Sequence, residues 1–190
     1  GYAFEQQLNA NTDHILDKPL EDYVNPEYLS QIPQMIFTPT IINDGRRMII
    51  AAQPMAFLNH INFTSKTIGP ENIEFIKLFE DNDAMRVKFT SVLRMNSTFP
   101  YVLPMVTLPT TPEILVMDAG IRDNYGTKTT IRFISGIEEW LIANTSGVVV
   151  LEIRDISKDY DMENLNQLSL FEKLTTPAAN FYGNFQHATE

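Results

Sequence analysis

The clearest hydrophobic pattern in the chain is a short apolar run that ends on a carboxylate. Residues 114–117 read Ile-Leu-Val-Met, and Asp118, Ala119 and Gly120 follow them. An apolar run of this length, bounded by small and polar residues, is typical of a buried strand. Such a strand presents the residue that follows it at the edge of a sheet, where reactive groups commonly lie. The pattern therefore makes Asp118 the central candidate residue.

A second pattern predicts a β-hairpin upstream of this strand, near residues 35–51. Residues 35–42 lead into Asn43-Asp44-Gly45, and residues 46–51 lead away. Two apolar arms around a glycine turn indicate paired antiparallel strands. Pro39 lies inside the first arm, so we expect that arm to lie at a sheet edge or to carry a bulge.

Helical spacing of apolar residues predicts most of the remaining regular structure. A helix capped by Asp83 should run to Asn96, where the following prolines end it. The most regular helix should span residues 127–143. The other predicted helices are a loose one over residues 2–16, a short one near residues 26–29, and one that begins at Pro70 with Ile73, Ile76 and Phe79 on its apolar face.

Residues 148–153 form an apolar, β-branched run that predicts a last strand. Strand, helix and strand in this order predict a parallel pair joined by a right-handed crossover. The sequence contains no repeat and no linker. We therefore predict an α/β fold in one domain over residues 1–190, with a polar, partly helical tail after residue 156.

Composition excludes several classes of function. A chain of 190 residues that is 44% apolar is large enough for one globular core. A net charge of -10 argues against binding to nucleic acid or to an anionic membrane surface. No apolar run approaches the roughly 20 residues of a transmembrane helix, and no signal peptide opens the chain. The absence of cysteine excludes a disulfide framework, a thiolate zinc site and a cysteine nucleophile, and it leaves the compartment undetermined.

Motifs for metal, cofactor and nucleophilic chemistry are absent from the sequence. The histidines, His14, His60 and His187, are far apart and none has metal-ligand spacing. No G-x-S-x-G elbow, G-x-G-x-x-G loop or Walker loop occurs. We predict no metal and no cofactor, and the sequence supplies no serine elbow to act with Asp118.

Two further patterns favour ordinary surface roles. N-x-[ST] tripeptides occur at Asn62, Asn96 and Asn144, but such short patterns arise by chance. Arg46 and Arg47 could grip a phosphate, yet beside a hairpin turn they more often form a solvated charge pair. We therefore assign neither pattern a function.

Asp118 itself has two interpretations. It can accept hydrogen bonds from the turn that follows it and do nothing more. Alternatively, Ala119 and Gly120 leave room above the strand for another segment or a ligand, while Asn124 ties the loop back. The second arrangement is that of an active-site rim.

Two segments resemble patatin-like phospholipases. The segment from Asp118 to Asn124 reads D-A-G-I-R-D-N and resembles the D-G-[GA]-x-x-x-N segment of that family. The segment from Ser97 to Pro104 reads S-T-F-P-Y-V-L-P and resembles the S-A-x-P-x-x-F-P segment that precedes it. Their order, their spacing and the upstream hairpin also fit, so the resemblance covers residues 30–155.

The resemblance implies a function and a fold. Asp118 would be the aspartate of a Ser-Asp dyad acting on lipid or other acyl esters, and Phe99, Pro100 and Tyr101 would line the acyl site. The family's oxyanion loop and G-x-S-x-G elbow lie upstream of everything in this chain. The chain would then be an incomplete three-layer α/β/α sandwich, truncated at both ends and inactive alone.

The departures from the family pattern leave alternatives open. Ala119 replaces the usual first glycine, and Gly126 stands where the family often has proline. One alternative is a non-catalytic binding or structural module built on the same fold. Another is an actin-like ATPase or sugar kinase, whose D-x-G turn joins two strands; here a helical pattern follows instead. A truncated domain would also expose apolar surface, so we expect self-association.

Overall fold

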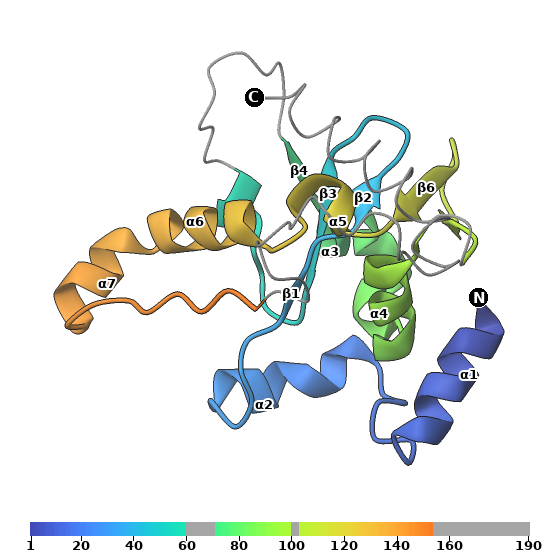
Figure 1. Ribbon diagram of the computed structural model, residues 1–190, viewed down its shortest axis with the longest axis horizontal. Coiled ribbons are helices and arrows are strands. Elements are labelled where there is room, and N and C mark those ends of the chain that lie inside the picture. Colours follow the sequence, from blue (N-terminus) through green and yellow to red (C-terminus); the bar gives the residue numbers. More distant parts are fainter. Residues whose placement is uncertain (60–70, 100–102, 154–190) are drawn as a thin grey trace, which may run out of the picture. The chain divides into compact units, whose positions relative to one another are not determined.

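The computed structural model describes residues 1–59, 71–99 and 103–153 (Figure 1). The chain divides into two units, Gly1–Val148 and Val149–Glu190. All of the described helices and strands lie in the first unit. The predicted polar tail after residue 156 lies outside the described residues. The fold that surrounds Asp118 is therefore the fold of the first unit.

The described strands form one mixed, largely antiparallel sheet of six strands in the order β1-β3-β2-β6-β5, with β4 also paired to β3. β3 pairs antiparallel with β1 and β2 and parallel with β4, and β6 lies between β2 and β5. The predicted hairpin is confirmed, with Pro39 separating β1 from β2 and Gly45 in its turn at a φ of +75°. The strands are β1 (Ile36–Phe37), β2 (Thr40–Ile41), β3 (Arg47–Ala51), β4 (Asn72–Glu74), β5 (Val106–Leu108) and β6 (Ile114–Met117).

Helices surround this sheet, so the described part of the chain has a broadly α/β fold, as predicted. The α-helices are α1 (Tyr2–Asn11), α2 (Val24–Tyr28), α3 (Phe75–Leu78), α4 (Phe89–Ser97), α5 (Gly120–Asp123), α6 (Thr127–Gly136) and α7 (Glu138–Asn144). Short 3-10 helices are η1 (Leu20–Tyr23), η2 (Ala56–Asn59), η3 (Glu80–Asn82) and η4 (Ala84–Arg86).

Apolar side chains of β3 pack on both faces of the sheet. Met48 and Ile50 join the larger apolar core, which includes side chains of α4. Ile49 and Ala51 join a smaller core with η2 and with Phe133 of α6. Alternate residues of a strand point to opposite faces, so this division follows directly from the extended backbone. Helices therefore cover β3 from two sides.

The segment after residue 70 differs from its prediction. A helix was expected from Pro70, but Asn72–Glu74 form strand β4, and α3 covers only residues 75–78. Pro70 itself lies outside the described residues. Buried polar partners explain the error, because Asn72 accepts a hydrogen bond from Arg47 at 3.0 Å and Glu74 accepts one from the Met55 N–H at 2.6 Å. A strand that buries polar side chains carries no apolar alternation to predict it.

The predicted cap of α4 is also wrong. Asp83 has a φ of +50° and makes no cap hydrogen bond, and α4 begins at Phe89 with Lys88 as its N-cap residue. The Phe89 N–H donates to the Lys18 carbonyl at 2.9 Å, and Lys88 forms a β-bridge with Pro19. This pairing with an upstream segment keeps the Lys88 backbone extended, so the helix begins after Lys88 and not near Asp83.

The long helix predicted over residues 127–143 is present as α6 and α7, which meet at Ile137. The strand predicted at residues 148–153 is not formed, and Val149 is 95% exposed. The parallel crossover is therefore wrong. β6 already pairs with β2 on one side and β5 on the other, both antiparallel, so neither edge is free for a further strand.

Candidate functional site

The backbone of Asp118 is fixed where β6 ends. Its N–H donates to the Thr98 carbonyl at 3.1 Å, which ties it to the end of α4. Its carbonyl accepts a hydrogen bond from the Thr40 Oγ1 of β2 at 3.0 Å. Asp118 therefore follows a core strand, as predicted, and neighbours on two other elements hold its main chain.

The Asp118 carboxylate is only partly committed to its own turn. Oδ1 accepts a hydrogen bond from the Gly120 N–H at 2.6 Å, and this is the one hydrogen bond to the carboxylate in the described part of the chain. Burial raises the pKa of Asp118 above its ordinary value of 3.8, and the Gly120 hydrogen bond opposes that rise. No cation among the described residues contributes to the shift. Oδ1 thus has the structural role considered above, while Oδ2 has no hydrogen-bond partner among the described residues.

A side chain at position 120 would displace the side chains that surround it in the loop after Asp118. A Cβ at Gly120 would lie 2.5 Å from the Asp118 Oδ1 and 2.8 Å from the Asn124 Oδ1. The structure thus brings these predicted residues together. Ala119 has a φ of −64° and a ψ of −30°, so it needs no glycine. Gly126 has a φ of +69°, which proline cannot adopt.

Asn96 holds this loop and was missed as a site residue. Its carbonyl accepts a hydrogen bond from the Ala119 N–H at 3.2 Å. Its Oδ1 accepts one from the Thr38 N–H at 2.9 Å, which links the loop to the segment between β1 and β2. Its place beside the predicted helix end was the available signal, since unpaired backbone groups collect there.

The predicted acyl-site residues are described only in part. Phe99 is partly buried just after α4, and its carbonyl accepts a hydrogen bond from the Leu103 N–H at 3.0 Å. Pro100 and Tyr101 lie outside the described residues. Their assignment to an acyl site stays a prediction.

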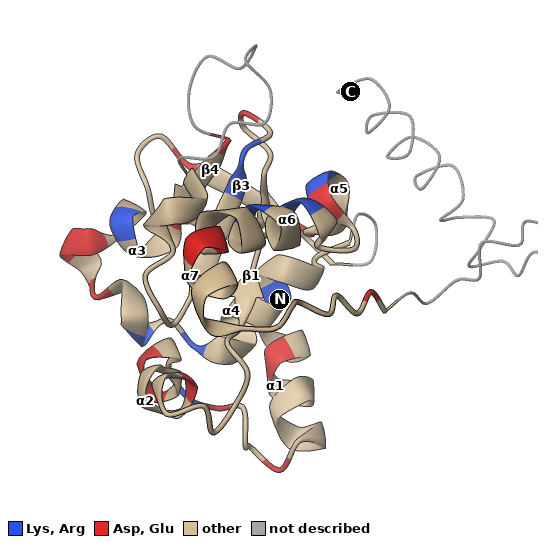
Figure 2. Cartoon of the chain, turned by 90° about the vertical axis from the view of Figure 1, so that its left-hand side faces the viewer, with Lys and Arg blue, Asp and Glu red and all other residues tan. Residues whose placement is uncertain are grey.

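Charged residues of β3, α5 and α6, whose positions along the ribbon Figure 2 marks by colour, form a largely buried network beside the loop with Glu71 and with Asn72 of β4. The Arg47 Nη1 lies 3.5 Å from the Asp123 Oδ2, and both side chains are 3% exposed. The Arg47 Nη2 lies 3.3 Å from the Glu71 Oε2, which also forms an ion pair with Arg132. Arg47 also donates from Nε to the Asn72 Oδ1. Four elements therefore meet through one group of polar side chains.

Arg46 and Arg47 have different environments, although the sequence suggested one solvated pair. The Arg46 side chain is partly exposed to solvent, as expected, and it forms an ion pair with Asp44 that the sequence did not predict. For Arg47 the expectation is wrong, because every residue of β3 is buried and the Arg47 side chain meets Asp123 and Glu71 inside the fold. Burial lowers the pKa of Arg47, Arg132 nearby lowers it further, and Asp123 and Glu71 oppose that change.

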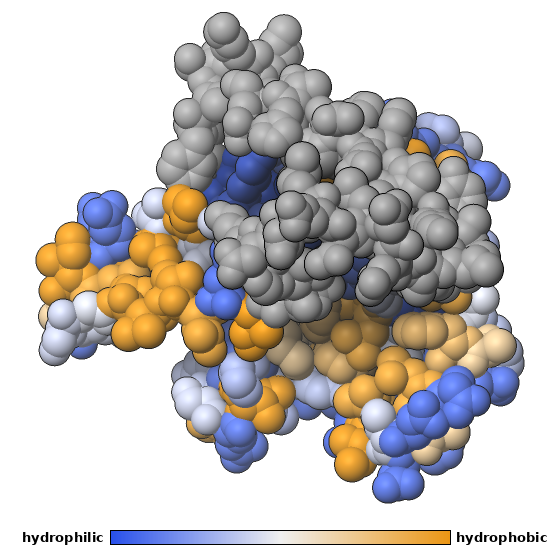
Figure 3. Space-filling view, viewed as in Figure 1, coloured by the Kyte–Doolittle hydropathy of each residue, from blue (hydrophilic) through white to orange (hydrophobic). Residues whose placement is uncertain are grey.

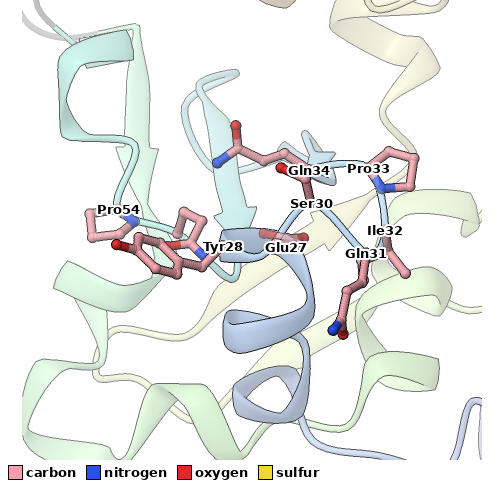
Figure 4. Close-up of a pocket in the computed structure, with 9 residues that line it drawn as sticks. Glu27, Tyr28, Ser30, Gln31, Ile32, Pro33, Gln34 and Pro54 are labelled. Atoms are coloured by element: carbon pink, nitrogen blue, oxygen red, sulfur yellow. The ribbon is translucent and has the colours of Figure 1, made fainter.

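Three cavities lined by described residues do not include Asp118. One of about 890 Å³ lies beside α2, with Glu27, Tyr28 and Pro54 on its wall (Figure 4). The Glu27 Oε1 accepts a hydrogen bond from the Met35 N–H at 3.1 Å, and burial raises the pKa of Glu27. A second, of about 570 Å³, is lined by residues of α3, α4 and β5, and a third, of about 510 Å³, lies between β1 and α6.

Stability should depend on the charge of Asp118. The pKa of Asp118 is higher in the folded state than in the unfolded state. The contribution of this carboxyl to folding stability is therefore fully present below pH 3.8, and it is lost as pH rises through the folded-state pKa. Asn at this position keeps an acceptor for the Gly120 N–H without the charge. We expect Asp118→Asn to raise the free energy of unfolding by about 0.5–1 kcal/mol near pH 7.

Urea unfolding at several pH values, from about pH 4 to about pH 7, measures the effect. Glu27 titrates in both proteins, so its contribution cancels in the difference. The stability advantage of the Asp118→Asn variant should shrink toward acid pH. A variant that is less stable than the parent at neutral pH would contradict the assignment of a desolvated carboxylate.

Comparison with known proteins returns no similarity: no protein-family model, no curated protein and no solved structure matches this chain. Among residues 1–59, 71–99 and 103–153, no helix is long and apolar enough to cross a bilayer. Within the same ranges, no group of three or more histidine, aspartate or glutamate side chains is placed to hold a metal ion. The function therefore has to be inferred from the residues and their geometry.

Proposed function

We propose that this chain is the aspartate-bearing part of a patatin-like serine acyl hydrolase that acts on lipid or other acyl esters. The proposal rests on the position and the hydrogen bonding of the Asp118 carboxylate. Asp118 follows a core strand, one carboxylate oxygen is oriented by the Gly120 N–H, and the other accepts no hydrogen bond in the described part of the chain. The D-A-G-I-R-D-N segment that surrounds it resembles the aspartate segment of that family.

The chemistry proposed for Asp118 is that of a general base. A serine hydroxyl is a weak nucleophile until a neighbouring base takes its proton. Oδ2 would accept that proton as the serine oxygen attacks the acyl carbon, and Oδ1 would stay bonded to the Gly120 N–H. A carboxylate whose pKa is raised by burial is a stronger base than one in water.

The serine and the oxyanion donors are proposed to come from an upstream segment. The chain contains no G-x-S-x-G motif, so we propose that it is inactive alone. The two apolar cores of β3, with α4 in one and α6 in the other, support the finer proposal of an incomplete α/β/α sandwich. The absence of a serine elbow favours the second candidate, a non-catalytic module of the same fold.

A longer form of the protein that includes the upstream segment tests the proposal. It should hydrolyse p-nitrophenyl butyrate and react covalently with a fluorophosphonate probe at one serine. The 190-residue chain serves as the negative control and should do neither. A longer form that neither hydrolyses the ester nor binds the probe would leave the non-catalytic module.

We infer further that the isolated chain associates with a second copy through α6 and α7. Figure 3 shows apolar side chains gathered over these helices. Trp140 is 60% exposed and Ile142 is 76% exposed, and Ile131 of α6 is also exposed. Large exposed aromatic and aliphatic side chains of this kind are enriched at protein interfaces.

Replacing Trp140 and Ile142 together by Gln should convert the proposed dimer to a monomer, because it removes the apolar contact area. Light scattering over a range of concentrations measures the change. Tyr28→Gln is a matched control, since Tyr28 is also a highly exposed apolar residue but lies on α2. A parent chain that stays monomeric at high concentration would contradict the inference.

A further inference from the structure

Asp123 connects the Asp118 loop to helix α6. It is the last residue of α5, which begins at Gly120. Its Oδ1 accepts a hydrogen bond from the Lys128 N–H at 3.0 Å. Its Oδ2 accepts hydrogen bonds from the Thr129 N–H at 2.8 Å and the Thr129 Oγ1 at 2.7 Å. One buried carboxylate thus closes the turn between two consecutive helices.

Arg47 connects the same carboxylate to the centre of the sheet. Its guanidinium lies 3.5 Å from Asp123, 3.3 Å from Glu71 and 3.0 Å from Asn72. Arg47 and Asp123 are 76 positions apart in the sequence. The planar guanidinium offers donors in several fixed directions, so it can hold several partners at once.

The strand register places a second connection beside the first. Thr40 of β2 is the cross-strand partner of both Arg47 on β3 and Met117 on β6. The Thr40 Oγ1 donates to the carbonyl of Asp118. Asp118 is therefore held at its main chain through Thr40, and the helix that begins two residues later is held through Asp123 and Arg47.

The cost of burying these charges suggests a role beyond stability. Two desolvated charges rarely stabilise a fold more than well-packed apolar side chains of the same size would. Buried ion pairs do fix the orientation and the separation of the two elements that carry them, because a misplaced partner leaves a buried charge unpaired. The Gly120 N–H that orients the Asp118 carboxylate belongs to the first residue of α5, the helix that Asp123 ends.

We propose that Arg47 and Asp123 are positioning residues that hold α5 against β3 and thereby keep the Gly120 N–H directed at the Asp118 carboxylate. The catalytic meaning of this clamp rests on the proposed function, but the clamp itself can be tested in the isolated chain. The clamp gives a role to Arg47, which the sequence suggested was solvated. Thr129 belongs to the same clamp, because it donates hydrogen bonds to Asp123.

Asp123→Asn tests the clamp through two local properties of the loop. Hydrogen exchange of the Gly120 amide, followed by NMR, should become about tenfold faster, because the helix that carries it loses its anchor. The pKa of Asp118, measured from the carbon-13 shift of its carboxyl, should move toward the ordinary value as the loop becomes hydrated. Both are measured at a temperature where circular dichroism shows the variant to be folded.

Matched variants separate positioning from general stability. Arg46→Gln removes the neighbouring exposed ion pair with Asp44 and should leave both readouts unchanged. Thr129→Val removes one hydrogen bond to Asp123, and Thr129→Ser retains it. The valine variant should therefore accelerate Gly120 exchange and the serine variant should not, which keeps the test decisive even where Asp123→Asn fails to fold.

The outcome that overturns the clamp is a folded Asp123→Asn chain with a lower melting temperature but unchanged Gly120 exchange and unchanged Asp118 pKa. In that case the network would stabilise the fold without positioning the loop. Ester hydrolysis by a longer Asp118→Asn protein tests the proposed function separately. Ester hydrolysis that persists in that protein would contradict the hydrolase assignment. It would not affect the result of the Gly120 hydrogen-exchange experiment.

Discussion

Arg47→Met is expected to lower the free energy of unfolding by about 3–5 kcal/mol, the range found when one partner of a buried ion pair is removed. Methionine nearly matches the length of the arginine stem but carries no charge. Asp123 would remain buried without its arginine partner, and the Asn72 Oδ1 would lose its arginine donor. Urea denaturation followed by circular dichroism measures the change, with an unchanged m-value indicating that only stability has altered.

The adjacent residue supplies the control. Arg46→Met breaks an ion pair whose side chains are both more than one-third exposed. Such surface pairs contribute about 0–1 kcal/mol, so the expected change is small. Adding Asp123→Asn to Arg47→Met should cost less than the sum of the two single changes, because the second change removes the charge that the first left unpaired. Equal effects of Arg46→Met and Arg47→Met would contradict the burial of Arg47.

Local sequence patterns predicted the elements whose neighbours along the chain determine them. The run Ile114–Met117 could be predicted as a strand because its residues are consecutively apolar and because Asp118 and Gly120 mark its end. The hairpin turn at Gly45 was predictable for the same reason. Asp118 could therefore be selected, and its place after a core strand anticipated, without any tertiary information.

Elements that depend on distant partners could not be predicted. Strand β4 exists because Asn72 and Glu74 find partners on other segments, and neither residue is apolar. Arg47 is buried because Asp123, far along the chain, meets it. The β-branched run at residues 148–153 shows the opposite failure. Its strand propensity is high, but β2 and β5 occupy both edges of β6.

The residues of the candidate site that the sequence did not predict act through backbone hydrogen bonds. Asn96 and Thr40 hold the loop through hydrogen bonds to the backbone of Ala119 and Asp118. Backbone partners carry no sequence signature, because every residue type offers the same N–H and carbonyl. Side-chain motifs therefore identify a candidate carboxylate and not the residues that hold its loop.

Asp118→Asn in a longer, serine-containing form of the protein is expected to reduce kcat for ester hydrolysis by about 10³–10⁴-fold, with little change in KM. Asparagine can still accept the Gly120 hydrogen bond, so the loop keeps its geometry. It cannot take the proton of the serine in the proposed reaction, so the expected loss falls on the chemical step. Initial rates with p-nitrophenyl butyrate over a range of substrate concentrations separate kcat from KM.

Asp44→Asn is the matched control for this loss, because Asp44 is an exposed carboxylate in the hairpin turn and should leave kcat unchanged. The same Asp118→Asn substitution is expected to stabilise the fold at neutral pH, since it removes a desolvated charge. A variant that gains stability while losing kcat would identify Asp118 as a residue kept for chemistry at a cost to folding. Unchanged kcat would instead assign the carboxylate to its turn alone.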